Sequence, residues 1–135
     1  AGRFSRVPSI RFDGGVAIEG SAAPGNAPAP FVSTAAVDPE EMFVASLSSC
    51  HMLWFLHLAR NGRIVVRSYM DEAEGIMGKG DDGRVSVTHV TLRPYVSCDA
   101  DASLVMNLHH KAHEECFIAN SVKTVMAVEP RLKDE

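Results

Sequence analysis

The stretch VDPEEMFVASLSSCHMLWFLHLARNG, residues 37–62, decides the fold because it predicts one long, buried helix. Asp38 and Glu41 have the spacing of a capping box, and Pro39 suits the first helical turn. At the other end, Arg60 lies in the last turn and is followed by Asn61 and Gly62. This pattern predicts that the helix ends at a residue in the left-handed conformation. Apolar residues occupy nearly every face between these ends, a pattern typical of a helix enclosed by its own domain.

Alternating and turn-rich segments flank this helix on both sides. Before the helix, they predict a hairpin over 3–21 that turns at Asp13-Gly14-Gly15 and an extended loop over 22–37. After it, they predict a longer hairpin in which 63–79 pairs with 84–98, then a helix over 103–116 capped near Asp101, and last a strand over 123–129. Strands placed before and after two helices predict a single α+β domain over residues 1–135. We expect a mainly antiparallel sheet with two main helices.

Composition narrows the class of protein. A formal charge of −4 and a pI near 5.8 disfavour a nucleic-acid partner, because no basic stripe is available to neutralise phosphates. The most apolar run, residues 42–59, is interrupted by serines and histidines, so we expect no membrane span. Three cysteines are a poor disulfide framework and favour a reducing compartment, with the cytoplasm as the default.

Two cysteines stand in the two predicted helices and could form a functional pair. A thiol attacks a peroxide only as the thiolate, so it needs a depressed pKa and access, which a neighbouring arginine would favour. Oxidation then gives a sulfenic acid that a second thiol can condense to a disulfide. Cys50 as attacking thiol and Cys116 as resolving thiol fit this chemistry, whereas Cys98 reads as a surface or spare thiol.

Other interpretations stay open at this point. His109, His113 and Cys116 share one helix face at the spacing of metal ligands, although no fourth ligand is recognisable. A Cys-dependent hydrolase would need an orienting third group that the sequence does not display. His51 and His57, inside the apolar helix, are expected to be hydrogen-bonded core residues.

The two cysteine-bearing segments together resemble the OsmC/Ohr family of thiol peroxidases. VDPEEMFVASLSSC at residues 37–50 resembles the family's first block, an Asn-Pro-Glu type motif before a small-residue-rich helix and a cysteine. ECFIANSVK at residues 115–123 resembles its second block, of the type Cys-Pro-hydrophobic-Ser. The resemblance runs from the first turn to Glu129. Asp38 in place of Asn, Phe117 in place of Pro, and His51 after the first cysteine depart from the pattern.

The resemblance implies roles for four residues. Cys50 matches the peroxidatic cysteine and Cys116 the resolving one, and Glu40 matches a glutamate that pairs with an arginine from the N-terminal strand. Arg6 is the first choice for that arginine and Arg11 the second. Positions ten apart on a straight helix are about 15 Å from each other. Glu40 therefore reaches Cys50 only through a helix break near residues 46–49, a long arginine or a second subunit.

The same resemblance implies the function. We expect a cytoplasmic, thiol-dependent peroxidase that reduces organic hydroperoxides to alcohols, is recycled by an external dithiol such as a lipoyl protein, and needs no metal, flavin or haem. An intertwined α+β homodimer with sites at the subunit interface is the implied assembly. By composition, an apolar substrate pocket would be lined by Phe43, Leu47, Trp54 and Phe117. The alternatives are a non-enzymatic redox-sensing or metal-binding relative and a Cys-dependent hydrolase.

Overall fold

A computed structural model describes residues 7–23, 33 and 35–131, and the chain divides into two compact units, Ala1–Phe43 and Val44–Glu135. In the first unit, β1 (Ser9–Arg11) pairs with β2 (Ala17–Glu19) in an antiparallel hairpin. Gly15 has a φ of 96°, a conformation that glycine adopts without steric cost, and it lies in the predicted turn. The first predicted hairpin is therefore confirmed.

Helix α1 (Pro39–Asn61) is unbroken and begins as the sequence predicts. The Asp38 Oδ1 atom accepts a hydrogen bond of 2.7 Å from the Glu41 N–H, and the Glu41 Oε1 atom accepts one of 3.3 Å from the Asp38 N–H. These two bonds form the capping box. At the other end, the prediction for Gly62 was wrong by one residue: its N–H still makes a helical hydrogen bond, and Arg63 takes the left-handed conformation with a φ of 58°.

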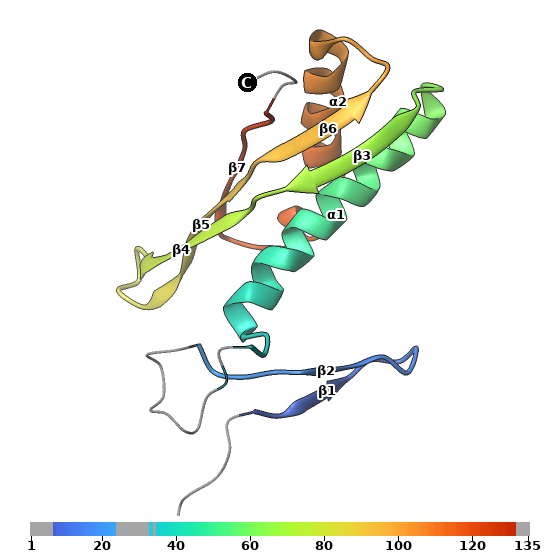
Figure 1. Cartoon of the computed structure of the whole chain (residues 1–135). Coiled ribbons are helices and arrows are strands. Elements are labelled where there is room, and N and C mark those ends of the chain that lie inside the picture. Colours follow the sequence, from blue (N-terminus) through green and yellow to red (C-terminus); the bar gives the residue numbers. More distant parts are fainter. Residues whose placement is uncertain (1–6, 24–32, 34, 132–135) are drawn as a thin grey trace, which may run out of the picture. The chain divides into compact units, whose positions relative to one another are not determined.

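Four strands of the second unit form one long ribbon, in which β3 continues into β4 and β5 into β6 (Figure 1). The strands are β3 (Val66–Asp71), β4 (Glu74–Lys79), β5 (Val85–Leu92) and β6 (Pro94–Cys98), with β3–β6 and β4–β5 antiparallel. The long predicted hairpin is confirmed but is interrupted halfway. There, the Asp71 carboxylate accepts hydrogen bonds from the Arg93 backbone N–H at 2.7 Å and from the Ser48 hydroxyl of α1 at 2.5 Å.

The C-terminal part supplies a second helix and one more strand. Helix α2 (Ala102–Glu115) is capped by Asp101, whose Oδ1 atom accepts a 2.8 Å hydrogen bond from the Leu104 N–H. A short 3-10 turn, η1 (Ala119–Ser121), follows it. Strand β7 (Val125–Val128) then lies parallel to β5, which gives a three-stranded sheet in the order β4-β5-β7.

The core of the second unit joins both helices to the ribbon. Buried apolar side chains come from α1, from β6 and from α2; they are Phe55, Ala59, Val96, Val105, Leu108 and Ala112. The fold is thus α+β with two main helices and mainly antiparallel strand pairing, as predicted. Among the described residues, α1 is also long and apolar enough to cross a membrane by length and composition. Because the core helix of a soluble protein can pass the same test, this criterion decides nothing alone.

Candidate functional site

The structure brings the thiols of Cys50 and Cys116 together. Cys50 lies in the middle of α1 and is half-buried, and Cys116 ends α2 with only 1% of its surface exposed. The two side chains are close enough that Cys50 raises the pKa of the Cys116 thiol, although the residues are far apart in the sequence. The two thiols are therefore neighbours in the folded chain.

Backbone and side-chain hydrogen bonds fix the turn that presents Cys116. The Ala119 N–H donates to the Cys116 Sγ atom at 3.5 Å, and the Asn120 N–H donates to the Cys116 carbonyl at 3.0 Å. The Asn120 side-chain amide donates to the carbonyl of Glu114 at 3.1 Å, which satisfies a helix-end acceptor. The Ser121 hydroxyl donates to the carbonyl of Phe117 at 2.8 Å. Sequence reasoning missed this role, although Asn and Ser shortly after a helix are a recognisable signal for such bonds.

Burial is the main reason that the pKa of the Cys116 thiol lies above its ordinary value. The hydrogen bond with Cys50 raises this pKa further, because it favours the protonated form of Cys116, while the N–H groups of Ala119 and Ile118 act in the opposite direction. Cys116 is therefore held as a thiol at neutral pH. Cys50 is the more exposed of the two sulfurs and the one that a dissolved molecule reaches first.

Aromatic side chains flank the pair of thiols. Trp54 lies one helical turn after Cys50 on α1, and Phe117 directly follows Cys116. Their rings meet edge to face, with centroids 5.4 Å apart and an interplanar angle of 77°. Phe117 is 68% exposed, whereas Leu47 is completely buried and presents no surface to a ligand. Phe43 is half-buried in the second turn of α1.

The predicted arginine–glutamate pair is only partly within the described residues. Arg6 lies outside them, and Arg11 is exposed on β1 with no ion pair to Glu40 in the part of the chain that the structure describes. The Glu40 Oε2 atom is buried and lacks a hydrogen-bond partner among those residues. Because α1 is continuous, a helix break does not shorten the separation between Glu40 and Cys50. A long arginine or a second subunit remains as the connection.

A second buried pair, formed by His51 and His109, lies in the same unit. The His51 Nε2 and His109 Nδ1 atoms are 2.9 Å apart, and the two stacked rings are nearly parallel at 6°. Burial lowers the pKa of His51 to about 4, with a further lowering by His113 that Asp71 opposes. Burial and then the charge of His51 lower the pKa of His109 to about 3. Both imidazoles are therefore neutral at physiological pH.

The structure does not assemble the metal site considered from the sequence. Within residues 7–23, 33 and 35–131, no group of three or more His, Cys, Asp or Glu side chains could hold a metal ion. The Nδ1 atom of His109 is bonded to His51 instead. His57, expected in the core, is exposed and hydrogen-bonded to Asn61, because its position on α1 faces away from the sheet. Cys98 is half-buried and packs against the core cluster.

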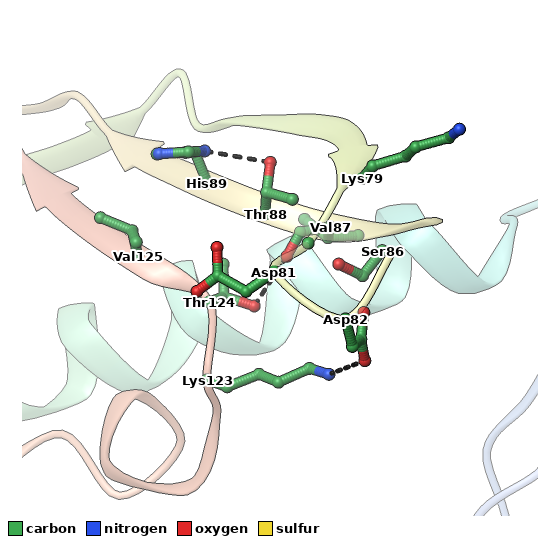
Figure 2. A pocket seen from close by; sticks show the side chains of 11 residues that line it. Lys79, Asp81, Asp82, Ser86, Val87, Thr88, His89, Lys123, Thr124 and Val125 are labelled. Atoms are coloured by element: carbon green, nitrogen blue, oxygen red, sulfur yellow. Dashed lines mark hydrogen bonds and ion pairs between the residues drawn. The ribbon is translucent and has the colours of Figure 1, made fainter. Parts of the chain in front are cut away.

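Two cavities in the same unit contain neither Cys50 nor Cys116. The larger, of about 420 Å³, lies between the β4–β5 turn and the start of β7, and Figure 2 shows its polar side chains bonded to one another, Lys123 to Asp82 and His89 to Thr88. The smaller, of about 220 Å³, is lined by Met106, His109, His110, His113, Met126, Val128 and Pro130. Neither cavity is lined by a cysteine, so the thiol pair is the better candidate for thiol chemistry.

Comparison with solved structures identifies proteins of similar fold. An OsmC-like protein of unknown function from Vibrio cholerae is 49% identical, with a TM-score of 0.89, and the alignment covers 94% of this chain and 85% of that one. The organic hydroperoxide resistance protein OhrB of Bacillus subtilis is 26% identical, with a TM-score of 0.72 and coverage of 97% and 93%. An organic hydroperoxide resistance protein from Elizabethkingia anophelis, 19% identical, has a TM-score of 0.75 and coverage of 96% and 90%, a likeness of fold.

Comparison of sequences gives the family directly. No curated protein matched the chain. A sequence profile of the OsmC-like proteins matches residues 32–131, a range that contains both cysteine-bearing segments and most of the fold described above. The chain therefore belongs to the family of OsmC-like proteins.

Proposed function

We propose that this protein is a two-cysteine thiol peroxidase that reduces organic hydroperoxides to alcohols. The observation that carries the proposal is the proximity of the Cys50 and Cys116 side chains. Membership of the OsmC-like family supports it, as does the likeness to proteins named for organic hydroperoxide resistance. The contact supplies what a disulfide-forming cycle needs, which is a reachable thiol with a second thiol beside it.

The proposed cycle follows from the difference between the two sulfurs. The thiolate of Cys50 attacks one oxygen of the peroxide bond, so that an S–O bond forms, the O–O bond breaks, and the departing alkoxide takes a proton to become the alcohol. Cys116, a buried thiol, then attacks the sulfenic sulfur of Cys50. An S–S bond forms and water leaves with the proton of Cys116. An external dithiol reduces this disulfide by exchange, and a lipoyl protein is the donor that we propose.

We assign the activation of Cys50 to Arg6 and, second, to Arg11, with Glu40 holding the guanidinium. Among the described residues, the buried Oε2 atom of Glu40 has no hydrogen-bond donor, which supports a cation at this position because a buried carboxylate oxygen without a donor is costly. A guanidinium donates in a fixed fork geometry and would satisfy that oxygen.

The surface near the thiols supports an apolar substrate. Trp54 and Phe117 would form the apolar wall of the pocket. Burial of alkyl groups against such side chains contributes about 0.8 kcal/mol for each CH₂ group. A substrate with a hydrocarbon chain would therefore bind better than hydrogen peroxide.

The apolar character of α1 supports a homodimer. In its most apolar window 22% of the residues are buried, and Leu53 is 59% exposed. A helix that is apolar on nearly all faces is usually covered on nearly all faces, which a second copy would achieve. A second copy would also be a source of the arginine that we propose for Glu40. The count of three cysteines, a poor disulfide framework, supports our placement of the protein in the reducing cytoplasm.

Peroxide consumption in the presence of dithiothreitol or dihydrolipoate tests the proposed function. Wild type should consume many equivalents of cumene hydroperoxide, Cys50→Ser should consume none, and Cys116→Ser should consume one equivalent and then stop. Cys98→Ser is the matched control and should behave as wild type. Full activity of Cys50→Ser would overturn the proposal, and undiminished turnover by Cys116→Ser would favour a one-cysteine enzyme, such as a Cys-dependent hydrolase.

A further inference from the structure

We propose that the edge-to-face contact between Trp54 and Phe117 is a positioning device that holds Cys116 against Cys50. The inference rests on the proposed two-cysteine cycle and assigns these two aromatic residues a role in its second step. Their ring centroids are 5.4 Å apart at an interplanar angle of 77°, which is the favourable arrangement for an aromatic pair. The contact links α1 to the turn that follows α2.

The Trp54–Phe117 contact and the Cys50–Cys116 pair join the same two segments of the chain. Cys50 and Trp54 are separated by one turn of α1, so their side chains lie on the same helix face. Their partners, Cys116 and Phe117, are consecutive residues. Two adjacent residues of the turn thus each engage one of two neighbouring positions on α1. A movement that separates the rings would also carry Cys116 away from Cys50.

Hydrogen bonds hold the backbone of the turn that contains Cys116 and Phe117. The carbonyl of Cys116 accepts from the Asn120 N–H at 3.0 Å, and the carbonyl of Phe117 accepts from the Ser121 hydroxyl at 2.8 Å. These bonds make the backbone around both residues one rigid piece. The position of the Phe117 ring therefore determines the position of the Cys116 sulfur.

The exposure of Phe117 distinguishes this role from ordinary core packing. Its side chain is 68% exposed, so replacing it leaves no enclosed cavity and should cost the fold little. Cys116, by contrast, is only 1% exposed and depends on its surroundings for its place. We therefore expect substitutions at Phe117 to act on the reaction of Cys116 and to leave global stability nearly unchanged.

The affected step is the condensation of the Cys50 sulfenic acid with the Cys116 thiol, in which the S–S bond forms and water leaves. An aromatic pair contributes about 0.5–1.5 kcal/mol beyond its buried area, so its loss should slow this step by about two- to tenfold. The attack of Cys50 on the peroxide does not involve Cys116, so a change in its rate reports the role of these rings in the pocket wall. Comparing the rates of the two steps therefore distinguishes a positioning role, which slows disulfide formation more, from a general loss of activity, which slows both steps equally.

Single-turnover experiments with Phe117→Leu and Trp54→Leu test the proposal. The reduced proteins are mixed with one equivalent of cumene hydroperoxide, and the sulfenic acid, trapped by dimedone, and the disulfide are followed by mass spectrometry. In each variant, disulfide formation should slow by about two- to tenfold more than sulfenic acid formation, which the loss of the pocket wall also affects. The double variant should be no slower than either single variant, because the same contact is lost.

His57→Ala is the matched control, since His57 makes the other edge contact of Trp54, with ring centroids 5.5 Å apart. It should form the disulfide at the wild-type rate. An unchanged disulfide rate in Phe117→Leu would overturn the proposal. So would equal slowing of both steps, or a higher KM for peroxide as the sole effect, since these outcomes would make the ring only a pocket wall.

A measurement without peroxide keeps this inference separate from the proposed function. In a buffer of oxidised and reduced dithiothreitol, the Cys50–Cys116 disulfide of Phe117→Leu should be about two- to tenfold easier to reduce than that of wild type. If wild type fails to consume peroxide but this difference is found, the proposed function is wrong and the positioning role stands. If the equilibrium is unchanged, the positioning role is wrong.

Discussion

Two neighbouring residues of α1, Cys50 and His51, each form a pair with the segment that begins at α2, and the two pairs differ in access. Consecutive helical residues point about 100° apart, so one position faces the core and the next turns toward the surface. His51 is 1% exposed and meets His109, whereas Cys50 is half-buried and meets Cys116. The imidazole pair is therefore closed off from solvent, whereas Cys50 of the thiol pair is partly accessible to it.

The largest expected effect comes from breaking the buried pair. His109→Ala should lower the free energy of unfolding by about 3–5 kcal/mol, because it leaves a cavity and a buried His51 ring nitrogen without its partner. Urea unfolding at pH 7.5 measures this. Cys50→Ser on the neighbouring position should cost less than about 1 kcal/mol. Equal losses in the two variants would remove the distinction between a structural pair and a reactive one.

Acid should weaken the buried imidazole pair. The pKa values of His51 and His109, about 4 and about 3, lie below the ordinary value of 6.5, so the unfolded chain binds protons first as pH falls. Their contribution to stability is complete above pH 6.5 and is lost as pH falls through 4 toward 3.

Between pH 6.5 and 5.5, unfolding should become easier by up to about 1.4 kcal/mol for each histidine. Urea unfolding at several pH values measures how steeply the free energy of unfolding changes with pH. A variant in which the exposed His57 is replaced by glutamine is the control, and its free energy of unfolding should change with pH as steeply as that of wild type. A wild-type free energy that is flat across this range would contradict neutral burial of the pair.

Alkylation rates sharpen the comparison within the thiol pair. Cys50 is half-buried and Cys116 is 1% exposed with a raised pKa, so iodoacetamide should modify Cys50 at least about tenfold faster at pH 8. Peptide mapping by mass spectrometry follows both sites, with half-buried Cys98 as an internal reference. Faster labelling of Cys116 would reverse the assignment of the attacking and resolving thiols.

The smallest expected effect is a stabilisation that leaves both pairs intact. Arg63→Gly should raise the free energy of unfolding by about 0.5 kcal/mol. The residue has a left-handed φ of 58°, which glycine adopts without strain, and this gain is partly offset because glycine increases the entropy of the unfolded chain. Thermal unfolding measures the gain. Alkylation of Cys50 should keep its rate, and a changed rate would show that thiol reactivity follows global stability instead of local access.

Local signals in the sequence were sufficient for most of the fold. The capping box at Asp38, the cap at Asp101 and the turn at Gly15 depend on residues three or four positions apart, and the structure has all of them. The interruption of the long hairpin was not predictable in the same way. It depends on Asp71 bonding both Ser48 and Arg93, which only the folded chain brings together.

The candidate site shows the same division. The spacing and family resemblance of the two cysteine segments pointed to Cys50 and Cys116, and the structure joins them. The pairing of His51 with His109 was not anticipated, because the sequence places these residues in separate helices and gives no register between them. The exposure of His57 was missed because an almost uniformly apolar helix offers no pattern that tells its inner from its outer face.

The parallel placement of β7 beside β5 has a consequence for synthesis of the protein. The edge of β5 that β7 covers stays open until residues 125–128 have left the ribosome, long after the β4–β5 hairpin can form. An open strand edge is a template for pairing with other chains. A ribosome that pauses before residues 125–128 have emerged would thus hold a chain whose β5 edge is open to pairing with other chains.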